Sequence, residues 1–184
     1  GNFGDILAGW VAKRMGLPIA KLVIASNEND ILPRAHATGA YEMRGVVETS
    51  SPSMDIQISS NFERYLFEAS GRDAGFIRGI MGALAQGGRF ELGPCAARFR
   101  EEFGAAWASE ADVADAIRRT EAASGYLMDP HTACGLVALE RNVPQAEVPG
   151  IVLSTAHPAK FPDAIERITG ARPGLPPRLA SLLT

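Results

Sequence analysis

A glycine-rich turn at the start of the chain carries the residues whose spacing most directly suggests chemistry. The segment Gly1–Asp5 (GNFGD) directly precedes Ile6, where apolar residues begin to recur at helical spacing. The first N–H groups of a helix have no partner within it and lie at the positive end of its dipole. The turn is therefore a candidate phosphate site, and the alternative is an ordinary turn that needs glycine only for its conformation.

A hydroxyl-rich segment forms the second candidate site. Ser154–His157 (STAH) follows the apolar residues at the start of Ile151–Thr155, a range that reads as a buried strand. Ligands of open α/β sheets bind at the carboxyl ends of strands, so a phosphorylated cofactor could lie between Thr155 and the opening turn. The alternative for Thr155 is a hydroxyl that satisfies a nearby backbone group.

Three cationic or titratable side chains are candidates for binding an anionic substrate. His131 and His157 could donate to a phosphate as imidazolium, and Lys160 could attract it as a point charge. The alternatives are helix-start histidines bonded to backbone and a solvated lysine. The three histidines and two cysteines show no metal-ligand spacing, so no metal site is predicted.

Composition excludes several classes of protein. The 184 residues carry a net charge of −3, and the 15 arginines and 3 lysines are scattered, so no basic field for nucleic acid is predicted. No apolar run approaches the roughly 20 residues that cross a bilayer. Cys95 and Cys134 are predicted to be reduced thiols of a cytoplasmic protein, with Cys134 buried and inert.

Strands alternate with helices along the chain. Strands are predicted at Lys21–Ser26, Gly45–Thr49 and Ile151–Thr155. Helices are predicted at Ile6–Met15, Ile31–Thr38, Asn61–Ala69, Asp73–Gln86, Ala96–Phe103, Ser109–Ala123, from Asp129, and at Pro162–Ile168. This order predicts an α/β fold in which helices cover both faces of a parallel sheet, giving three layers.

Two polar segments follow predicted strands. Asn27, Asn29 and Asp30 could line the mouth of the site, but a turn with Asp30 as helix cap is the favoured interpretation. The range Ser51–Asp55 could be a substrate loop, and a structural turn is an equal alternative.

Six segments, in order, make the chain resemble threonine synthases. They are Gly1–Gly9 (GNFGDILAG), Ser26–Leu32 (SNENDIL), Ser51–Gln57 (SPSMDIQ), Ser59–Arg64 (SSNFER), Asp129–Ala133 (DPHTA) and Ser154–Phe161 (STAHPAKF). The resemblance extends from the first residue to about Phe161.

The resemblance implies a pyridoxal-phosphate enzyme of fold type II that converts O-phospho-L-homoserine and water into L-threonine and phosphate. Residues 1–184 would be the C-terminal part of its large cofactor-binding domain. Gly1, Asn2, Phe3, Gly4 and Asp5 would hold the cofactor phosphate, and Thr155 would give its hydroxyl to the pyridine nitrogen. Asp5 is expected to cap the helix or turn away, because a carboxylate is unfavourable beside a phosphate.

The resemblance also implies that one essential group lies elsewhere. The family's Schiff-base lysine belongs to an N-terminal region that this chain lacks, so no catalytic residue is assigned here. We expect no turnover by the chain alone, and self-association through an exposed sheet edge. The alternatives are another fold type II lyase, such as threonine dehydratase or cysteine synthase, and a non-catalytic module that binds phosphorylated ligands.

Overall fold

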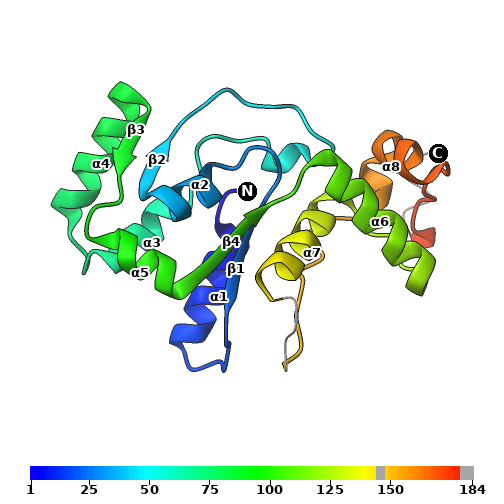
Figure 1. Cartoon of the computed structure of the whole chain (residues 1–184), viewed down its shortest axis with the longest axis horizontal. Coiled ribbons are helices and arrows are strands. Elements are labelled where there is room, and N and C mark those ends of the chain that lie inside the picture. Colours follow the sequence, from blue (N-terminus) through cyan, green and yellow to red (C-terminus); the bar gives the residue numbers. More distant parts are fainter. Residues whose placement is uncertain (144–147, 179–184) are drawn as a thin grey trace.

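The computed structural model describes residues 1–143 and 148–178, and Figure 1 shows their arrangement. The helices are α1 Gly4–Arg14, α2 Ile31–Thr38, α3 Phe62–Ala69, α4 Ala74–Gly87, α5 Cys95–Glu102, α6 Glu110–Ser124, α7 Pro130–Asn142 and α8 Pro162–Thr169. The 3₁₀ turns η1 and η2 span Pro52–Met54 and Pro158–Lys160. The strands are β1 Leu22–Ser26, β2 Ala40–Glu42, β3 Arg89–Glu91 and β4 Phe103–Trp107.

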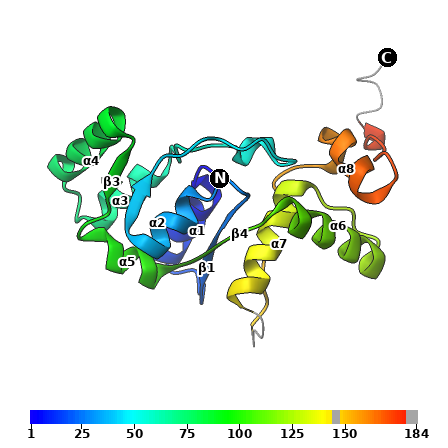
Figure 2. The same ribbon diagram turned by 45° about the horizontal axis from the view of Figure 1, so that its top comes forward.

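A parallel strand pair lies at the centre of the molecule. β1 pairs with β4 in the register Leu22↔Phe103 to Ser26↔Trp107. Helix α7 packs on this pair from one side, and α1 and α2 pack on it from the other, as both views show (Figures 1 and 2). The predicted α/β fold, with helices on both faces of a parallel sheet, is confirmed.

Two strands were predicted wrongly. Gly45–Thr49 has no strand partner, because side chains of Asn29 and Asp55 bond its backbone instead. Ile151–Thr155 is also irregular, since no strand among the described residues borders it, and a strand forms only by pairing.

Three strands were missed. β4 contains the small residues Gly104, Ala105 and Ala106, which have little β-propensity, and pairing with β1 determines its conformation. The side-chain ends of Asn142 and Lys21 pack closely over Gly104, where a Cβ would meet both. β2 and β3 form a short antiparallel pair in which Tyr41 faces Phe90.

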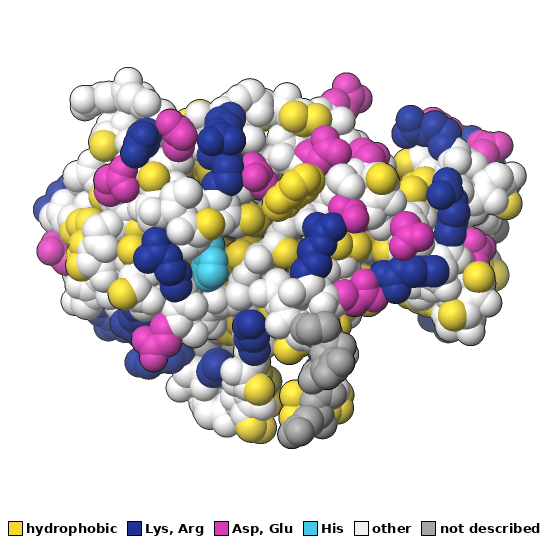
Figure 3. All heavy atoms as spheres, in the orientation of Figure 1, with side chains coloured by type: hydrophobic (Ala, Val, Ile, Leu, Met, Phe, Trp, Pro, Cys, Tyr) yellow, Lys and Arg dark blue, Asp and Glu magenta, His cyan; other side chains and the backbone are white. Residues whose placement is uncertain are grey.

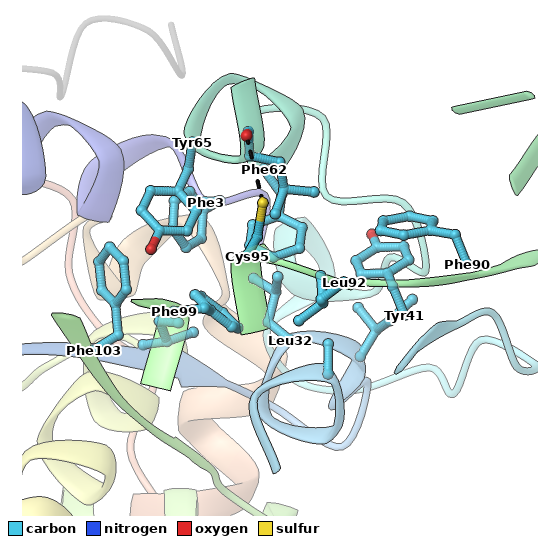
Figure 4. Packing of buried hydrophobic residues seen from close by; sticks show 14 of the residues in the cluster. Phe3, Leu32, Tyr41, Phe62, Tyr65, Phe90, Leu92, Cys95, Phe99 and Phe103 are labelled. Carbon is cyan, nitrogen blue, oxygen red and sulfur yellow. Dashed lines mark hydrogen bonds between the residues drawn. The ribbon is translucent and has the colours of Figure 1, made fainter. Parts of the chain in front are cut away.

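An aromatic core fixes the start of the chain (Figure 4). The Phe3 ring lies 5.2 Å from that of Phe62 and 5.4 Å from that of Phe103, and Tyr65 and Phe99 complete the cluster. Phe3 is only 3% exposed although it precedes a helix in a turn. Its backbone is left-handed, with φ at 67°, a conformation that costs about 1–2 kcal/mol outside glycine. Burial of the ring offsets this strain and holds the turn in place.

We therefore predict that Phe3→Ala lowers the free energy of unfolding by about 3–5 kcal/mol, because it leaves a cavity among four aromatic rings. Urea unfolding measures the change. Met15→Ala is the matched control at the other end of α1; its side chain is 83% exposed, so we expect a change within about 0.5 kcal/mol. Equal effects of the two substitutions would contradict this view of Phe3.

Candidate functional site

The opening turn lies at the carboxyl end of β1. The nitrogen of Gly1 lies 3.5 Å from the carbonyl oxygen of Ala25, which is next to the last residue of the strand. Asn2 Oδ1 accepts a hydrogen bond from the N–H of Gly4 at 2.9 Å, and this closes the turn before α1. Asp5 is exposed on the first turn of the helix, and the N-cap residue is Phe3. The turn thus has the position at a strand end that the sequence predicted.

The turn is shaped to bind through its main chain. A Cβ at Gly1 would lie 3.1 Å from Met54 Cα, and a Cβ at Gly4 would lie 3.0 Å from Asn2 Oδ1. A side chain at Gly1 would thus press on the main chain of η1, whereas one at Gly4 would meet the end of the Asn2 side chain. The first N–H groups of α1 are donors without partners within the helix. Glycine backbone and helix-end donors together fit a phosphate ester such as that of a phosphorylated cofactor.

A buried amide anchors the loop after β2 to the end of β1. The Nδ2 atom of Asn27 has two hydrogens to donate and lies 2.8 Å from Thr49 Oγ1, 2.9 Å from Ser51 Oγ and 2.7 Å from Asp55 Oδ1. Its Oδ1 accepts from the backbone N–H of Asn29 at 2.9 Å. Asn27 is thus the centre of a network that fixes residues 49–55, whose only regular element is the short 3₁₀ turn η1.

The sequence indicated a turn at Asn27–Asp30 but missed this role. The available signal was a pair of asparagines directly after a buried strand, which are costly to bury unless they are hydrogen-bonded. Asp30 occupies the predicted N-cap position, but its side chain makes no capping bond. It instead accepts from Arg34 Nε at 2.7 Å.

The start of α7 meets the 3₁₀ turn η1. Asp129 caps the helix by accepting from the backbone N–H of His131 at 2.9 Å, and Pro130 occupies the first helical position, as predicted. His131 is buried, with 9% of its surface exposed, and its Nε2 accepts from the N–H of Ser53 at 3.3 Å. Cys134 Sγ lies 3.9 Å from Ser51 Oγ. The motifs at 51–57 and 129–133 are therefore in direct contact.

Burial sets the protonation of two groups here. It raises the pKa of the Cys134 thiol to about 12, so this thiol is neutral at ordinary pH, in line with the predicted inert cysteine. Burial alone would also raise the pKa of Asp129, but hydrogen bonds from His131 and Thr132 outweigh it and lower that pKa.

The segment that carries Thr155 runs along α7. Val152 packs on Gly135, and Ser154 Oγ lies 3.0 Å from the hydroxyl of Tyr126. Thr155 is exposed, and farther along the segment Phe161 packs on the ring of His131 at 4.8 Å. The segment therefore returns to the start of α7, where η1 and Gly1 also lie.

The other two predicted substrate-binding residues are on the surface of this segment. His157 Nδ1 accepts from the backbone N–H of Ala159 at 3.1 Å, so it caps η2. The ammonium of Lys160 lies 5.9 Å from the centroid of the Phe161 ring. His131, by contrast, uses both ring nitrogens within the protein.

The surface of the described chain also has hollows away from the turn. Hollows of about 320 and 370 Å³ are lined by Trp10, Lys13, Arg14 and Glu102, and by Glu28, Asp30, Val47, Trp107 and Ser109. Neither includes the turn, and the second is lined by two carboxylates. Acidic and basic side chains are interspersed on the face in Figure 3. Within residues 1–143 and 148–178, no helix is long and apolar enough to cross a membrane.

The fold is α/β, with a glycine-containing turn at the carboxyl end of a parallel strand. A family model described as "Threonine synthase, C-terminal" matches residues 132–184. The chain is 46% identical to a threonine synthase from Methylobacillus glycogenes over 99% of its own length. The chain belongs to the threonine synthase family.

Solved structures agree with this family. Pyridoxal-phosphate-bound threonine synthase from Brucella melitensis superposes with a TM-score of 0.94 at 53% identity, and yeast threonine synthase with 0.90 at 38%. Both comparisons cover the whole of this chain but only 39% and 41% of the other. The chain likewise spans 39% of the length of the Methylobacillus enzyme and of a Pseudomonas aeruginosa threonine synthase that is 40% identical.

We predict that the buried Cys134 thiol makes stability fall at high pH. Its pKa is about 12 in the folded protein, against 9.0 ordinarily, so above pH 9 only the unfolded chain releases this proton. From pH 8 to pH 10 the free energy of unfolding should fall by about 1.4 kcal/mol through this group alone. Urea unfolding at both pH values should give a smaller fall for Cys134→Ala by that amount; equal falls would refute the assignment.

Proposed function

We propose that this chain forms the part of a threonine synthase that binds the phosphate and ring nitrogen of pyridoxal phosphate. The enzyme would convert O-phospho-L-homoserine and water into L-threonine and phosphate. The observation that carries the proposal is the glycine-containing turn Gly1–Asp5, which lies at the end of β1 and leads directly into the first turn of α1. The family membership and the pyridoxal-phosphate-bound relative from Brucella melitensis support it.

The residues have separate roles in this proposal. Backbone N–H groups of Gly1–Asp5 and the first turn of α1 would hold the cofactor phosphate, and the packing of Phe3 in the core would fix their direction. The N–H of Gly4 would have to leave Asn2 Oδ1 in order to take part. The hydroxyl of Thr155 would bond the ring nitrogen. When bound, the ring withdraws electrons from the substrate, and a neutral hydroxyl moderates this because it does not enforce protonation of the nitrogen.

The substrate phosphate is proposed to meet His157 and Lys160. Both are exposed on the segment that follows Thr155, so each can reach a ligand without breaking the core. His131 remains a third candidate by sequence, but its Nε2 already accepts a backbone hydrogen bond. His131 would have to lose that bond in order to donate to a phosphate.

The covalent base is proposed to come from outside these residues. The chain has three lysines, and Lys21 directly precedes β1, at the end opposite the turn. Its ammonium lies 3.5 Å from the carbonyl of Asn142, and that of Lys13 lies 3.3 Å from the carbonyl of Ala20. Neither is placed to reach a ligand at the turn.

We also propose a cytoplasmic location for the enzyme. Cys95 and Cys134 are buried and form no disulfide, as is usual for proteins of that compartment.

A different fold type II lyase is the alternative reaction. The contact between Ser53 and His131 joins the two motifs that favour threonine synthase, and it lies beside Gly1. This arrangement ties both motifs to the proposed cofactor site, and it therefore favours threonine synthase over threonine dehydratase.

A hybrid enzyme tests the proposed activity. In it, residues 1–184 replace the matching part of the Methylobacillus threonine synthase, which shares 46% identity with them. We expect steady phosphate release from O-phospho-L-homoserine by the hybrid and none by the chain alone.

In the hybrid, Thr155→Val should lower kcat by about tenfold or more, because one hydrogen bond to the ring is lost. Thr169→Val, whose hydroxyl bonds only within its own helix end, is the control.

A folded hybrid that binds the cofactor and releases no phosphate would contradict the proposed activity. Multiple turnovers by the chain alone would contradict the assignment of the covalent base to a residue outside it.

Self-association is the expected behaviour of the isolated chain. Ile151 is 81% exposed and Leu153 is 57% exposed, while β1 and β4 each pair on one side only. Apolar side chains and unpaired strand edges favour contact with a second copy. Light scattering should show a mass that rises with concentration and falls back for the variant Ile151→Asp/Leu153→Asp. A constant monomer mass for the unsubstituted chain would refute this expectation.

A further inference from the structure

A buried chain of hydrogen bonds runs from the cap of α7 to the turn η1. Asp129 Oδ1 lies 2.9 Å from His131 Nδ1, and the Nε2 of the same ring accepts from the N–H of Ser53 at 3.3 Å. Asp129 is 1% exposed. The side of the ring packs on Phe161, so the imidazole is fixed in position as well as in hydrogen bonding.

These partners determine which ring nitrogen carries the proton. A backbone N–H can only donate, so Nε2 acts as the acceptor and Nδ1 carries the proton toward the carboxylate. The carboxylate thereby selects one neutral tautomer and one ring orientation. Loss of the Asp129 carboxylate would consequently weaken the hydrogen bond between His131 and Ser53, because the ring would no longer be held in this tautomer and orientation.

This arrangement resembles a hydrolytic Ser–His–Asp group in composition but not in geometry. In such a group the nitrogen that acts as base faces a serine hydroxyl. Here that nitrogen faces the main-chain N–H of Ser53 instead. The pair is therefore arranged to support a segment of main chain.

The supported segment lies against the first residue of the anion-binding turn. Met54 Cα would be 3.1 Å from a Cβ at Gly1, so the main chains of η1 and the turn are in close contact. Ser51, at the other end of η1, is held by Asn27 and lies 3.9 Å from the Cys134 sulfur. A shift of η1 would therefore move one wall of the turn.

We propose that His131, oriented by Asp129, is a positioning residue that fixes residues 51–54 against Gly1 and so sets the shape of the phosphate-binding turn. The inference rests on the proposed function, since the turn is the proposed cofactor-phosphate site. It assigns His131 a task other than contact with the substrate.

Two substitutions separate the halves of this chain of bonds. The asparagine amide can take the place of Nδ1, so His131→Asn keeps the bond to Asp129 and loses the acceptor for Ser53. The glutamine oxygen can take the place of Nε2, so His131→Gln keeps that acceptor. His36→Asn is the control, because it removes a histidine whose Nε2 bonds a backbone carbonyl, that of Phe103.

The experiment measures amide hydrogen exchange at residues 51–54 and the affinity for pyridoxine 5′-phosphate. This probe has the phosphate and the ring but no aldehyde, so it cannot react with lysines. His131→Asn should speed exchange at Ser53 by about fivefold or more and weaken binding by a similar factor, because one hydrogen bond is lost. His131→Gln should restore both values, and His36→Asn should leave both unchanged.

Unchanged exchange at Ser53 in His131→Asn would overturn the inference, and so would faster exchange with unchanged affinity for the probe. Failure of the unsubstituted chain to bind the probe would instead count against the proposed function, and the exchange data would still decide whether His131 holds η1.

Discussion

The buried ring of Phe3 is the interaction on which the rest of the site depends. It holds a non-glycine residue in the left-handed conformation immediately before α1, and the aromatic core supplies the contacts that make this possible. Because the Phe3 ring is held in place, the backbone at Gly1 and Gly4, on either side of Phe3 in the chain, is held in one orientation. The same core reaches β4 through Phe103 and α5 through Phe99. The shape of the turn that we propose as the phosphate site is thus determined by hydrophobic packing on its opposite side.

Hydrogen bonds hold the segment of residues 49–55 that lies beside the turn. Residues 49–55 have little regular structure, so Asn27 holds them from the end of β1 and His131 holds them from the start of α7. These anchors are buried and hydrogen-bonded, which is the condition under which burial of polar groups is tolerated. The strand end, the turn and the helix start are consequently one connected unit. Thr155 joins that unit through its own segment, which packs on α7 and ends against the ring of His131.

Local sequence patterns predicted much of this fold, while tertiary contacts determined the rest. The helices and β1 follow from apolar periodicity and capping residues such as Asp129, which act within a few residues. β4 could not be predicted, because Gly104–Ala106 becomes a strand only beside β1. Ile151–Thr155 has a strand sequence but no partner among the described residues. At the site, the position of the opening turn was predictable from its glycines. The long-range roles of Asn27 and Ser53 were not, since hydrogen bonds to distant residues leave no local pattern.

The most direct test of the account is an NMR titration of the amide-labelled chain with pyridoxine 5′-phosphate. The account predicts that the amide signals of Gly4, Asp5 and Thr155 shift together and saturate at one ligand per chain. Shifts that are confined to only one of these two regions, or that saturate at different concentrations, would contradict a single cofactor site shared by the opening turn and Thr155.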